Sequence, residues 1–349
     1  EAALLLLRYG LPHESLLVHQ EALRVLRGLQ HIEARKVVTE ATTGLSWNKR
    51  LDALRVLRAW PHGETRSAFL EALDDRQWQV RAEAVRGLTK HRHRLVVKAL
   101  IDRLAEEKGR MREDIRDALV ILTGEKIRPD ASEWRAWWRQ IDEGWQPPEV
   151  KSEEMGTRKR LGTAVRKGLY GQIVSERACF LLDSSGSMLA GTELEGNRFD
   201  IASRELIRVL ETQLDPRSEF NLVVFADEAL RMAPNLQRAK GSTVGKAIRY
   251  IEARRAGGET NTFEALKLAF SDSGVDTIYL LSDGQPTVGE ETIPTLILDA
   301  VQLWNRYRGV RVHCIGFFPG DARNQDKLEA RDFLRQLARR NQGKYTEIE

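Results

Sequence analysis

The second half of the chain contains a segment, Arg177–Met188, that reads RACFLLDSSGSM. Its first part is a short apolar run typical of a buried strand, and its second part is a series of small polar residues typical of a turn. Asp183, Ser185 and Ser187 therefore follow directly after a predicted strand. Because ligands of parallel sheets bind beyond the carboxyl ends of the strands, this turn is the first candidate for a binding site.

Strand-like and helix-like segments alternate from Tyr170 to the last residue. The predicted strands span 177–182, 219–225, 228–233, 277–281, 310–317 and 344–348. Helical periodicity is found in 198–210, 244–252, 262–270, 295–304 and 327–339. This alternation predicts a doubly wound, mainly parallel sheet with helices on both faces. We expect 228–233 to pair antiparallel with 219–225, 344–348 to be an edge strand, and the sheet to contain one antiparallel edge strand.

Two further polar segments are expected at the same edge of this sheet. Ser282–Gly284 follows another predicted strand, and Gly257–Thr262 precedes a predicted helix. Together with the first turn, they supply carboxylates and hydroxyls and no imidazole or thiolate. Oxygen ligands of this kind favour Mg²⁺, Mn²⁺ or Ca²⁺ and disfavour zinc. The sequence therefore predicts a site for a hard divalent cation.

These residues resemble the von Willebrand factor type A (VWA) domain and its metal-ion-dependent adhesion site. The Asp-x-Ser-x-Ser element of that family is matched by Asp183, Ser185 and Ser187. Its distant threonine is matched by Thr260, and its Asp-Gly element by Asp283. The resemblance covers residues 170–349. The stretch 189–196 departs from it, because it is longer and more acidic than in many relatives.

The resemblance implies a Rossmann-like VWA fold and a mode of binding. In such a site the hydroxyls of Ser185, Ser187 and Thr260 coordinate Mg²⁺ directly, while the two aspartates act largely through water. Neutral hydroxyl ligands leave the charge of the ion poorly compensated, so an aspartate or glutamate of a partner protein completes the coordination shell favourably. In relatives, the last helix shifts when the ligand completes the coordination shell of the metal. The corresponding helix here is the one expected at 327–339.

The first 125 residues contain an internal repeat with a step of 31 positions. The pentapeptide ALRVL occurs at 22–26 and again at 53–57, and related blocks begin at Ala84 and Ile115. A residue able to carry positive charge lies three places before each block, namely His19, Arg50, Arg81 and Arg112. Second segments with helical spacing lie at 65–73 and 95–104. A helix pair about every 30 residues is typical of an α-solenoid.

The stretch Asp74–Leu88 resembles a HEAT repeat of the compact bacterial type, with an acidic turn followed by a Val-Arg-x-x-Ala-x-x-x-Leu helix. We therefore expect HEAT-like helical repeats over residues 1–127. The charged and weakly patterned residues 147–169 predict a linker to the VWA domain at 170–349.

A tryptophan-rich helix is expected between the repeats and the linker. Asp130 is its predicted N-cap, because an acidic residue follows three places later. Trp134, Trp137, Trp138 and Ile141 then form one stripe at helical spacing. The stripe favours a capping helix within 128–146 that buries the open end of the solenoid, with an aromatic ligand platform as the alternative.

Composition limits the possible classes of protein. No run approaches the roughly 18 to 20 uncharged apolar residues needed to cross a bilayer, so we do not expect membrane insertion. The chain has two cysteines, Cys179 and Cys314, both in predicted strands, which indicates buried free thiols. With 55 Lys and Arg against 51 Asp and Glu, charge is too balanced for a dedicated nucleic-acid binder. The first residue is Glu1 rather than Met, so we expect the true start to be missing, and the compartment, cytoplasmic or exported, stays undecided.

These features raise three possible functions. The first is a non-enzymatic protein-binding module, in which Mg²⁺ captures an acidic residue of a partner and the helical repeats provide a second docking surface or scaffold. The alternative is an RNA or ribonucleoprotein scaffold, because helical repeats joined to a VWA domain resemble the Ro ribonucleoprotein and Arg50, Arg81 and Arg112 form a basic ladder. Metal-dependent hydrolysis is not expected, because no base is paired with a nucleophile near Thr260 and Asp283. The sequence does not indicate the partner, the biological process or the oligomeric state.

Overall fold

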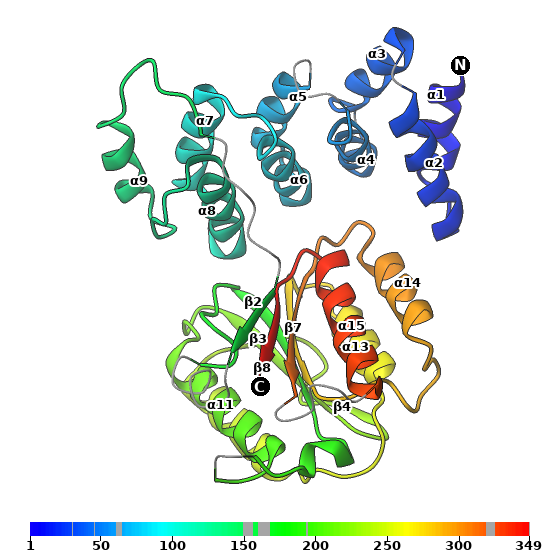
Figure 1. Ribbon diagram of the computed structural model, residues 1–349, viewed down its shortest axis with the longest axis vertical. Coiled ribbons are helices and arrows are strands. Elements are labelled where there is room, and N and C mark those ends of the chain that lie inside the picture. The colour runs from blue at the N-terminus through cyan, green and yellow to red at the C-terminus, as the bar shows by residue number, and fades with distance from the viewer. Residues whose placement is uncertain are drawn as a thin grey trace. The chain divides into compact units, whose positions relative to one another are not determined.

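A computed structural model of the chain describes residues 1–29, 31–44, 46–60, 65–148, 156–159, 168–192, 195–318 and 325–348. The chain divides into two compact units, Glu1–Glu153 and Glu154–Glu349 (Figure 1). The first unit is helical and the second is built on a β-sheet. Within the described ranges, every helix is too short or too polar to traverse a lipid bilayer.

The described part of the helical unit consists of short helices. In chain order these are α1 (Ala2–Leu5), the π-helical turn η1 (Leu6–Gly10), α2 (Leu16–Gly28), α3 (Ile32–Ala41), α4 (Trp47–Leu57), α5 (Arg66–Glu71), the 3-10 turn η2 (Ala72–Asp74), α6 (Trp78–Leu88), α7 (Arg94–Leu104), α8 (Gly109–Thr123) and α9 (Ala131–Trp138). The predicted helices at 65–73 and 95–104 correspond to α5 with η2 and to α7.

The 31-residue repeat falls on α2, α4, α6 and α8, which pack successively against one another. All four helices bury the first and last residues of the repeated block, which are Ala22 and Leu26, Ala53 and Leu57, Ala84 and Leu88, and Ile115 and Leu119. These positions are four residues apart, so they lie on one face of each helix. The repeated pattern is therefore the pattern of the shared core.

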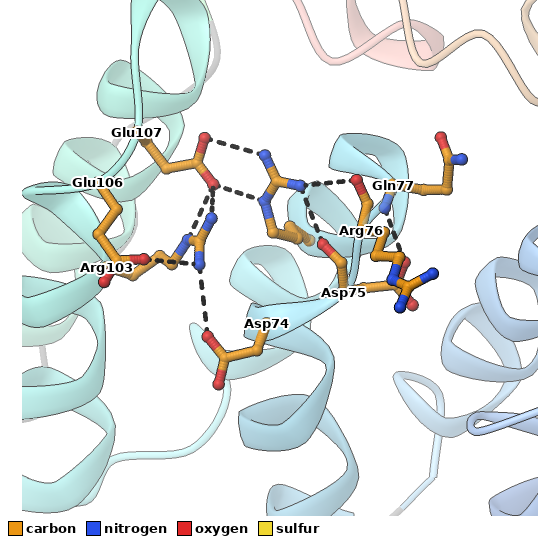
Figure 2. A network of polar contacts seen from close by, with 8 residues as sticks. Asp74, Asp75, Arg76, Gln77, Arg103, Glu106 and Glu107 are labelled. Carbon is orange, nitrogen blue, oxygen red and sulfur yellow. Dashed lines mark hydrogen bonds and ion pairs between the residues drawn. The ribbon is translucent and has the colours of Figure 1, made fainter.

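Arginines three places before the blocks connect consecutive repeats. Arg81 binds the carboxylate of Glu107 with contacts of 2.5 and 3.1 Å, and its Nη1 donates to the carbonyl oxygen of Asp75 at 2.9 Å. Figure 2 shows the surrounding network, in which Arg103 also contacts Asp74, Glu106 and Glu107. One guanidinium therefore fixes its own turn and holds the next repeat.

Arg50 makes the equivalent contacts one repeat earlier. Its Nε donates to Oδ2 of Asp75 at 2.6 Å, and its Nη1 donates to the carbonyl oxygen of Gly44 at 2.8 Å. Arg112, at the end of the series, donates from Nη2 to the carbonyl oxygen of Pro129 at 2.5 Å. The basic ladder thus has structural partners inside the helical unit.

A buried carboxylate lies between α4 and α6. Glu83 is fully buried, and it accepts hydrogen bonds from Nε of Arg58 at 2.6 Å and Nη1 of Arg86 at 2.7 Å. Burial opposes ionisation of this group, but the charges of Arg86, Arg58 and Arg55 outweigh it and lower the pKa of Glu83 to about 2. The repeats are therefore joined by an ionised pair network as well as by apolar packing.

Helix α9 begins as the sequence predicts. The carboxylate of Asp130 accepts hydrogen bonds from the backbone N of Ser132 and of Glu133, at 2.8 and 3.1 Å. Trp134 is fully buried, and α9 packs against α7. The helix ends at Trp138, before Ile141, so the aromatic stripe is one turn shorter than predicted.

In the second unit, the described residues form one eight-stranded sheet. Its strands are β1 (Gly156–Lys159), β2 (Arg177–Asp183), β3 (Glu219–Phe225), β4 (Ala229–Arg231), β5 (Gln237–Arg238), β6 (Thr277–Ser282), β7 (Arg311–Phe317) and β8 (Tyr345–Ile348). The order is β1-β8-β7-β6-β2-β3-β4, and β5 also pairs with β3. Only β4 and β5 are antiparallel to their neighbour. The prediction of a doubly wound, mainly parallel sheet is confirmed.

One detail of the predicted sheet is wrong. Residues 344–348 were expected at an edge, but β1 pairs in parallel with β8 and lies outside it. Strand β1 falls within 147–169, the stretch for which we predicted a linker. A strand of four residues without an apolar run leaves no periodic signal in the sequence.

Helices cover both faces of the sheet. They are η3 (Gly186–Leu189, a 3-10 turn), α11 (Arg198–Thr212), α12 (Gly241–Glu252), α13 (Thr262–Ser271), α14 (Pro294–Asn305) and α15 (Gln325–Arg340). Phe180 and Leu182 of β2 belong to the core formed with α11 and α12. Cys179 and Leu181 belong to the core on the other face, which α13 and α15 cover in Figure 1.

Both cysteines are buried free thiols, as predicted. Cys179 and Cys314 lie in the same apolar core, and burial raises the pKa of both thiols above their usual range. They act as small apolar side chains of that core.

Candidate metal centre

Asp183 ends β2 between two neighbouring strands. Strand β2 pairs in parallel with β3 on one side and with β6 on the other, so Ser282 at the end of β6 lies close to Asp183. Ser282 donates from Oγ to Oδ2 of Asp183 at 2.5 Å, and the backbone N of Ser185 donates to Oδ1 at 2.8 Å. Asp183 is fully buried, so both oxygens of its carboxylate are held in place.

A row of oxygen atoms continues from the first turn to Asp283. The hydroxyls of Ser185 and Ser187 are 3.1 Å apart, and Ser187 donates to Oδ1 of Asp283 at 2.5 Å. Asp283, which directly follows β6, is fully buried. Two predicted site segments that are far apart in the sequence therefore meet at one edge of the sheet.

Thr260 is brought to the same edge by backbone hydrogen bonds. The N of Gly257 donates to the carbonyl oxygen of Ser184, and the N of Gly186 donates to that of Gly258, both at 2.8 Å. A Cβ built on Gly284 would lie 3.5 Å from Oγ1 of Thr260 and 3.6 Å from Oγ of Ser187. The two hydroxyls thus lie on the same side of Gly284, both within van der Waals distance of that Cβ position.

The spacing of these oxygens fits a hard cation. Two ligands of an octahedral Mg²⁺, each about 2.1 Å from the ion and at right angles, lie about 3 Å apart. The contacts of 3.1 Å between Ser185 and Ser187 and of 2.5 Å between Ser187 and Asp283 bracket that value. The described residues hold no group of three or more His, Cys, Asp or Glu side chains suited to a metal. The hydroxyls are therefore essential to the candidate site.

Electrostatics at the site disfavours two close carboxylates. Burial and the charge of Asp283 raise the pKa of Asp183 to about 6, against the opposing effect of the hydrogen bonds from Ser185 and Ser282. A divalent cation bound near both groups would offset their repulsion.

Two basic residues that the sequence analysis missed also contact Asp283. Arg198, the first residue of α11, places Nη1 2.5 Å from Oδ2 of Asp283. Lys327 of α15 donates from Nζ to the carbonyl oxygen of Asp283 at 2.7 Å. One signal was available for Arg198, because a positive charge in the first turn of a helix is opposed by the helix dipole.

The stretch 189–196, which departs from the family pattern, leads into α11. Gly191 and Asn197 form an isolated antiparallel bridge. Asn197 caps α11 and forms a capping box with Asp200. The bridge and the capping box fix the start of the helix, and with it the position of Arg198. Residues 193–194 of this stretch lie outside the described part of the chain.

Comparison with known families agrees with this architecture. The family profile of the von Willebrand factor type A domain matches residues 179–285, and that of HEAT repeats matches residues 35–120. The chain therefore contains a VWA domain preceded by helical repeats of the HEAT type.

Curated relatives match the VWA part. The chain is 31% identical over 178 residues to von Willebrand factor A domain-containing protein 3A of Homo sapiens, covering 51% of this chain and 14% of that protein. It is 33% identical over 153 residues to inter-alpha-trypsin inhibitor heavy chain H4 of Homo sapiens, covering 40% of this chain and 15% of that protein. The match thus spans about a seventh of each relative.

Solved structures also match part of the chain. The von Willebrand factor type A protein from Catenulispora acidiphila has a TM-score of 0.40 and 20% identity, over 50% of this chain and 38% of that one. The conserved hypothetical protein BatB from Bacteroides thetaiotaomicron has a TM-score of 0.37 and 19% identity, over 50% of this chain and 90% of that one.

Proposed function

We propose that this protein is a non-enzymatic, Mg²⁺-dependent protein-binding module. In this proposal Asp183, Ser185, Ser187, Thr260 and Asp283 hold Mg²⁺, or Mn²⁺ or Ca²⁺ in its place, and the ion captures an aspartate or glutamate of a partner. The HEAT-type repeats over 1–127, followed by a capping helix in 128–146 and a linker in 147–169, provide a second docking surface. The observation that carries the proposal is a row of oxygen contacts from Ser185 through Ser187 to the buried carboxylate of Asp283. The second buried carboxylate, that of Asp183, is held next to this row by Ser282 and by the backbone N of Ser185.

In this proposal, some residues of the site orient the carboxylates and others supply hydroxyl ligands. Ser282 and the backbone N of Ser185 orient the carboxylate of Asp183, and Ser187 orients that of Asp283. Ser185, Ser187 and Thr260 supply neutral hydroxyls, which leave the net charge of a bound ion uncompensated. When bound, the ion supplies a Lewis-acidic position that an external carboxylate occupies.

Support for binding rather than catalysis comes from the partners of the histidines. His313 stacks on Tyr279 at a ring distance of 5.0 Å within the sheet. His91 contacts the hydroxyl of Thr65 at 3.3 Å inside the helical unit. Both rings therefore have structural partners within their own units.

The RNA-scaffold alternative loses its motivating observation. Arg50 and Arg81 are bound to Asp75 and Glu107, and their side chains are only 15% and 14% exposed. To bind these arginines, a phosphate would have to break their ion pairs. That is unfavourable unless the phosphate's own contacts offset the loss. We therefore propose the protein-binding function alone.

The first test measures the metal itself. We expect the wild-type chain to bind one Mn²⁺, displaceable by Mg²⁺, in an electron paramagnetic resonance titration of free Mn²⁺. Asp183→Ala and Thr260→Val should lose this binding, because the first removes a carboxylate from the site and the second a hydroxyl. Asp299→Ala on α14 is the matched control, since its side chain is 54% exposed and contacts Arg340 instead. Equal Mn²⁺ binding by all four proteins, each checked for folding by circular dichroism, would contradict the proposal.

A second test addresses the partner. Immobilised wild-type chain in Mg²⁺ should retain a protein that EDTA elutes and that mass spectrometry identifies, while the Asp183→Ala chain retains none of it. If the same partner is retained after EDTA and by Asp183→Ala, capture does not depend on the metal.

A further inference from the structure

We propose that Arg198 and Lys327 make cation binding at this centre conditional on an anionic ligand. The inference rests on the proposed function and adds a mechanism of regulation to it. Two basic side chains already compensate the negative charge of the site's carboxylates. The site therefore binds a metal ion weakly when the ion is alone, and more tightly when an external carboxylate binds with it.

The first observation is the burial of Arg198. Its side chain is 5% exposed, and its Nη1 lies 2.5 Å from Oδ2 of Asp283, a fully buried group. The capping box of Asn197 and Asp200 sets the first turn of α11, from which the side chain reaches the site. A buried guanidinium has few alternative positions, because moving it away leaves the carboxylate of Asp283 without its nearest positive charge.

The second observation is that a basic side chain from another helix also contacts Asp283. Lys327 of α15 is 16% exposed, and its Nζ lies 3.8 Å from Oδ2 of Asp283 as well as 2.7 Å from its carbonyl oxygen. Asp283 therefore faces positive charge from α11 and from α15, while Ser187 occupies its other carboxylate oxygen.

These contacts set the charge of the site. Before a metal ion binds, Arg198 and Lys327 bring two positive charges to Asp283, as many as the negative charges that Asp183 and Asp283 carry together when ionised. A divalent ion then adds two positive charges beside a buried guanidinium, and like charges at such distances repel strongly where water is scarce. An external carboxylate relieves that repulsion, so the ion and the carboxylate must raise each other's affinity by the same factor.

The test is a titration of Mn²⁺ in chloride and in acetate at equal ionic strength. For the wild-type chain, we expect acetate to raise the affinity for Mn²⁺ by several fold. In Arg198→Gln the affinity in chloride should rise on the order of tenfold, since a positive charge next to the ion is gone. The additional effect of acetate should shrink in the same variant.

Arg204→Gln is the matched control. Arg204 lies on the same helix and carries the same charge, but it donates to the carbonyl oxygen of Glu195 and not to Asp283. We expect its Mn²⁺ affinity to equal that of the wild-type chain. Lys327→Gln should change the affinity in the same direction as Arg198→Gln and by less, because its Nζ is farther from the carboxylate. It also serves as the test if Arg198→Gln does not fold.

Thermal unfolding gives an independent reading. Without metal, Arg198→Gln should melt below the wild-type chain because Asp283 loses its nearest positive charge. Mn²⁺ should raise the melting midpoint of this variant by more than that of the wild-type chain. Unchanged or reduced Mn²⁺ affinity in both Arg198→Gln and Lys327→Gln would overturn this inference while leaving the proposed function intact. If no protein in the set binds Mn²⁺ in either salt, the proposed function itself fails and this inference falls with it.

Discussion

Gly258 illustrates how single residues position the candidate centre. Its backbone has φ of +78°, and a Cβ there would lie 2.1 Å from Oδ2 of Asp227. Its carbonyl oxygen accepts the hydrogen bond from Gly186 that joins the two loops at 2.8 Å. Glycine is favoured here because residues with a side chain rarely adopt this backbone conformation, and because the carboxylate of Asp227 occupies the space that a Cβ would need.

We predict that Gly258→Ala lowers the free energy of unfolding by about 1–3 kcal/mol, from backbone strain and overpacking. Mn²⁺ affinity should fall as well, because the loop that carries Thr260 is displaced. Urea unfolding and the Mn²⁺ titration measure the two effects. Gly245→Ala is the control, since its nearest atom would be 3.6 Å away in the middle of α12 and alanine favours a helix. Equal losses in the two variants would argue against a special role for Gly258.

The oxygen-bearing residues could be predicted from the sequence, whereas the contacts of Arg198 and Lys327 with Asp283 could not. Asp183, Ser185 and Ser187 form a local pattern directly after an apolar strand. The contacts of Arg198 and Lys327 with Asp283 span 85 and 44 positions of the chain. Such pairs are determined by where two helices begin relative to the sheet, which no periodicity encodes.

At the scale of elements, strands with an apolar run are predicted within a residue of their ends. Strand β3 spans Glu219–Phe225, as expected, because six of its seven residues are buried. Strands β1 and β5 were missed. Strand β1 consists of four polar or small residues and β5 of two polar residues. Each forms because the backbone of a neighbouring strand offers hydrogen-bonding groups.

The buried network of α4 and α6 predicts how the helical unit responds to acid. The pKa of Glu83 is about 2 in the folded chain, against 4.5 for a glutamate in the unfolded chain. Since the folded value is the lower one, the stabilisation is complete above pH 4.5 and is lost as the pH falls toward 2. The shift corresponds to about 3 kcal/mol of unfolding free energy.

Urea unfolding followed by circular dichroism between pH 6 and pH 2.5 should show this loss in the wild-type chain. Glu83→Gln should be less stable near neutral pH and should lose less stability on acidification. Glu71→Gln, an exposed position on α5, is the control and should follow the wild-type chain. An identical decline with pH in Glu83→Gln would mean that Glu83 is not the titrating group.

At the scale of the whole molecule, each compact unit has an apolar core of its own. The helical unit buries the repeated blocks of α2, α4, α6 and α8, and the second unit buries side chains on both faces of its sheet. The sequence anticipated this division because the hydrophobic period changes from helical repeats to alternating strands and helices. It could not anticipate β1, which extends the sheet into residues expected to be a linker.

Separate cores lead us to predict that metal acts on one unfolding transition only. In differential scanning calorimetry, Mg²⁺ at about 100 times its dissociation constant should stabilise the VWA domain by about 2.7 kcal/mol and leave the helical unit unchanged. Glu83→Gln identifies the transition of the helical unit, because it should lower that midpoint alone. Asp183→Ala should remove the effect of Mg²⁺ on the other transition, since the ion then lacks a complete site. A Mg²⁺ shift that persists in Asp183→Ala would place the ion elsewhere. A shift of both transitions would contradict the prediction that the metal stabilises the VWA domain alone.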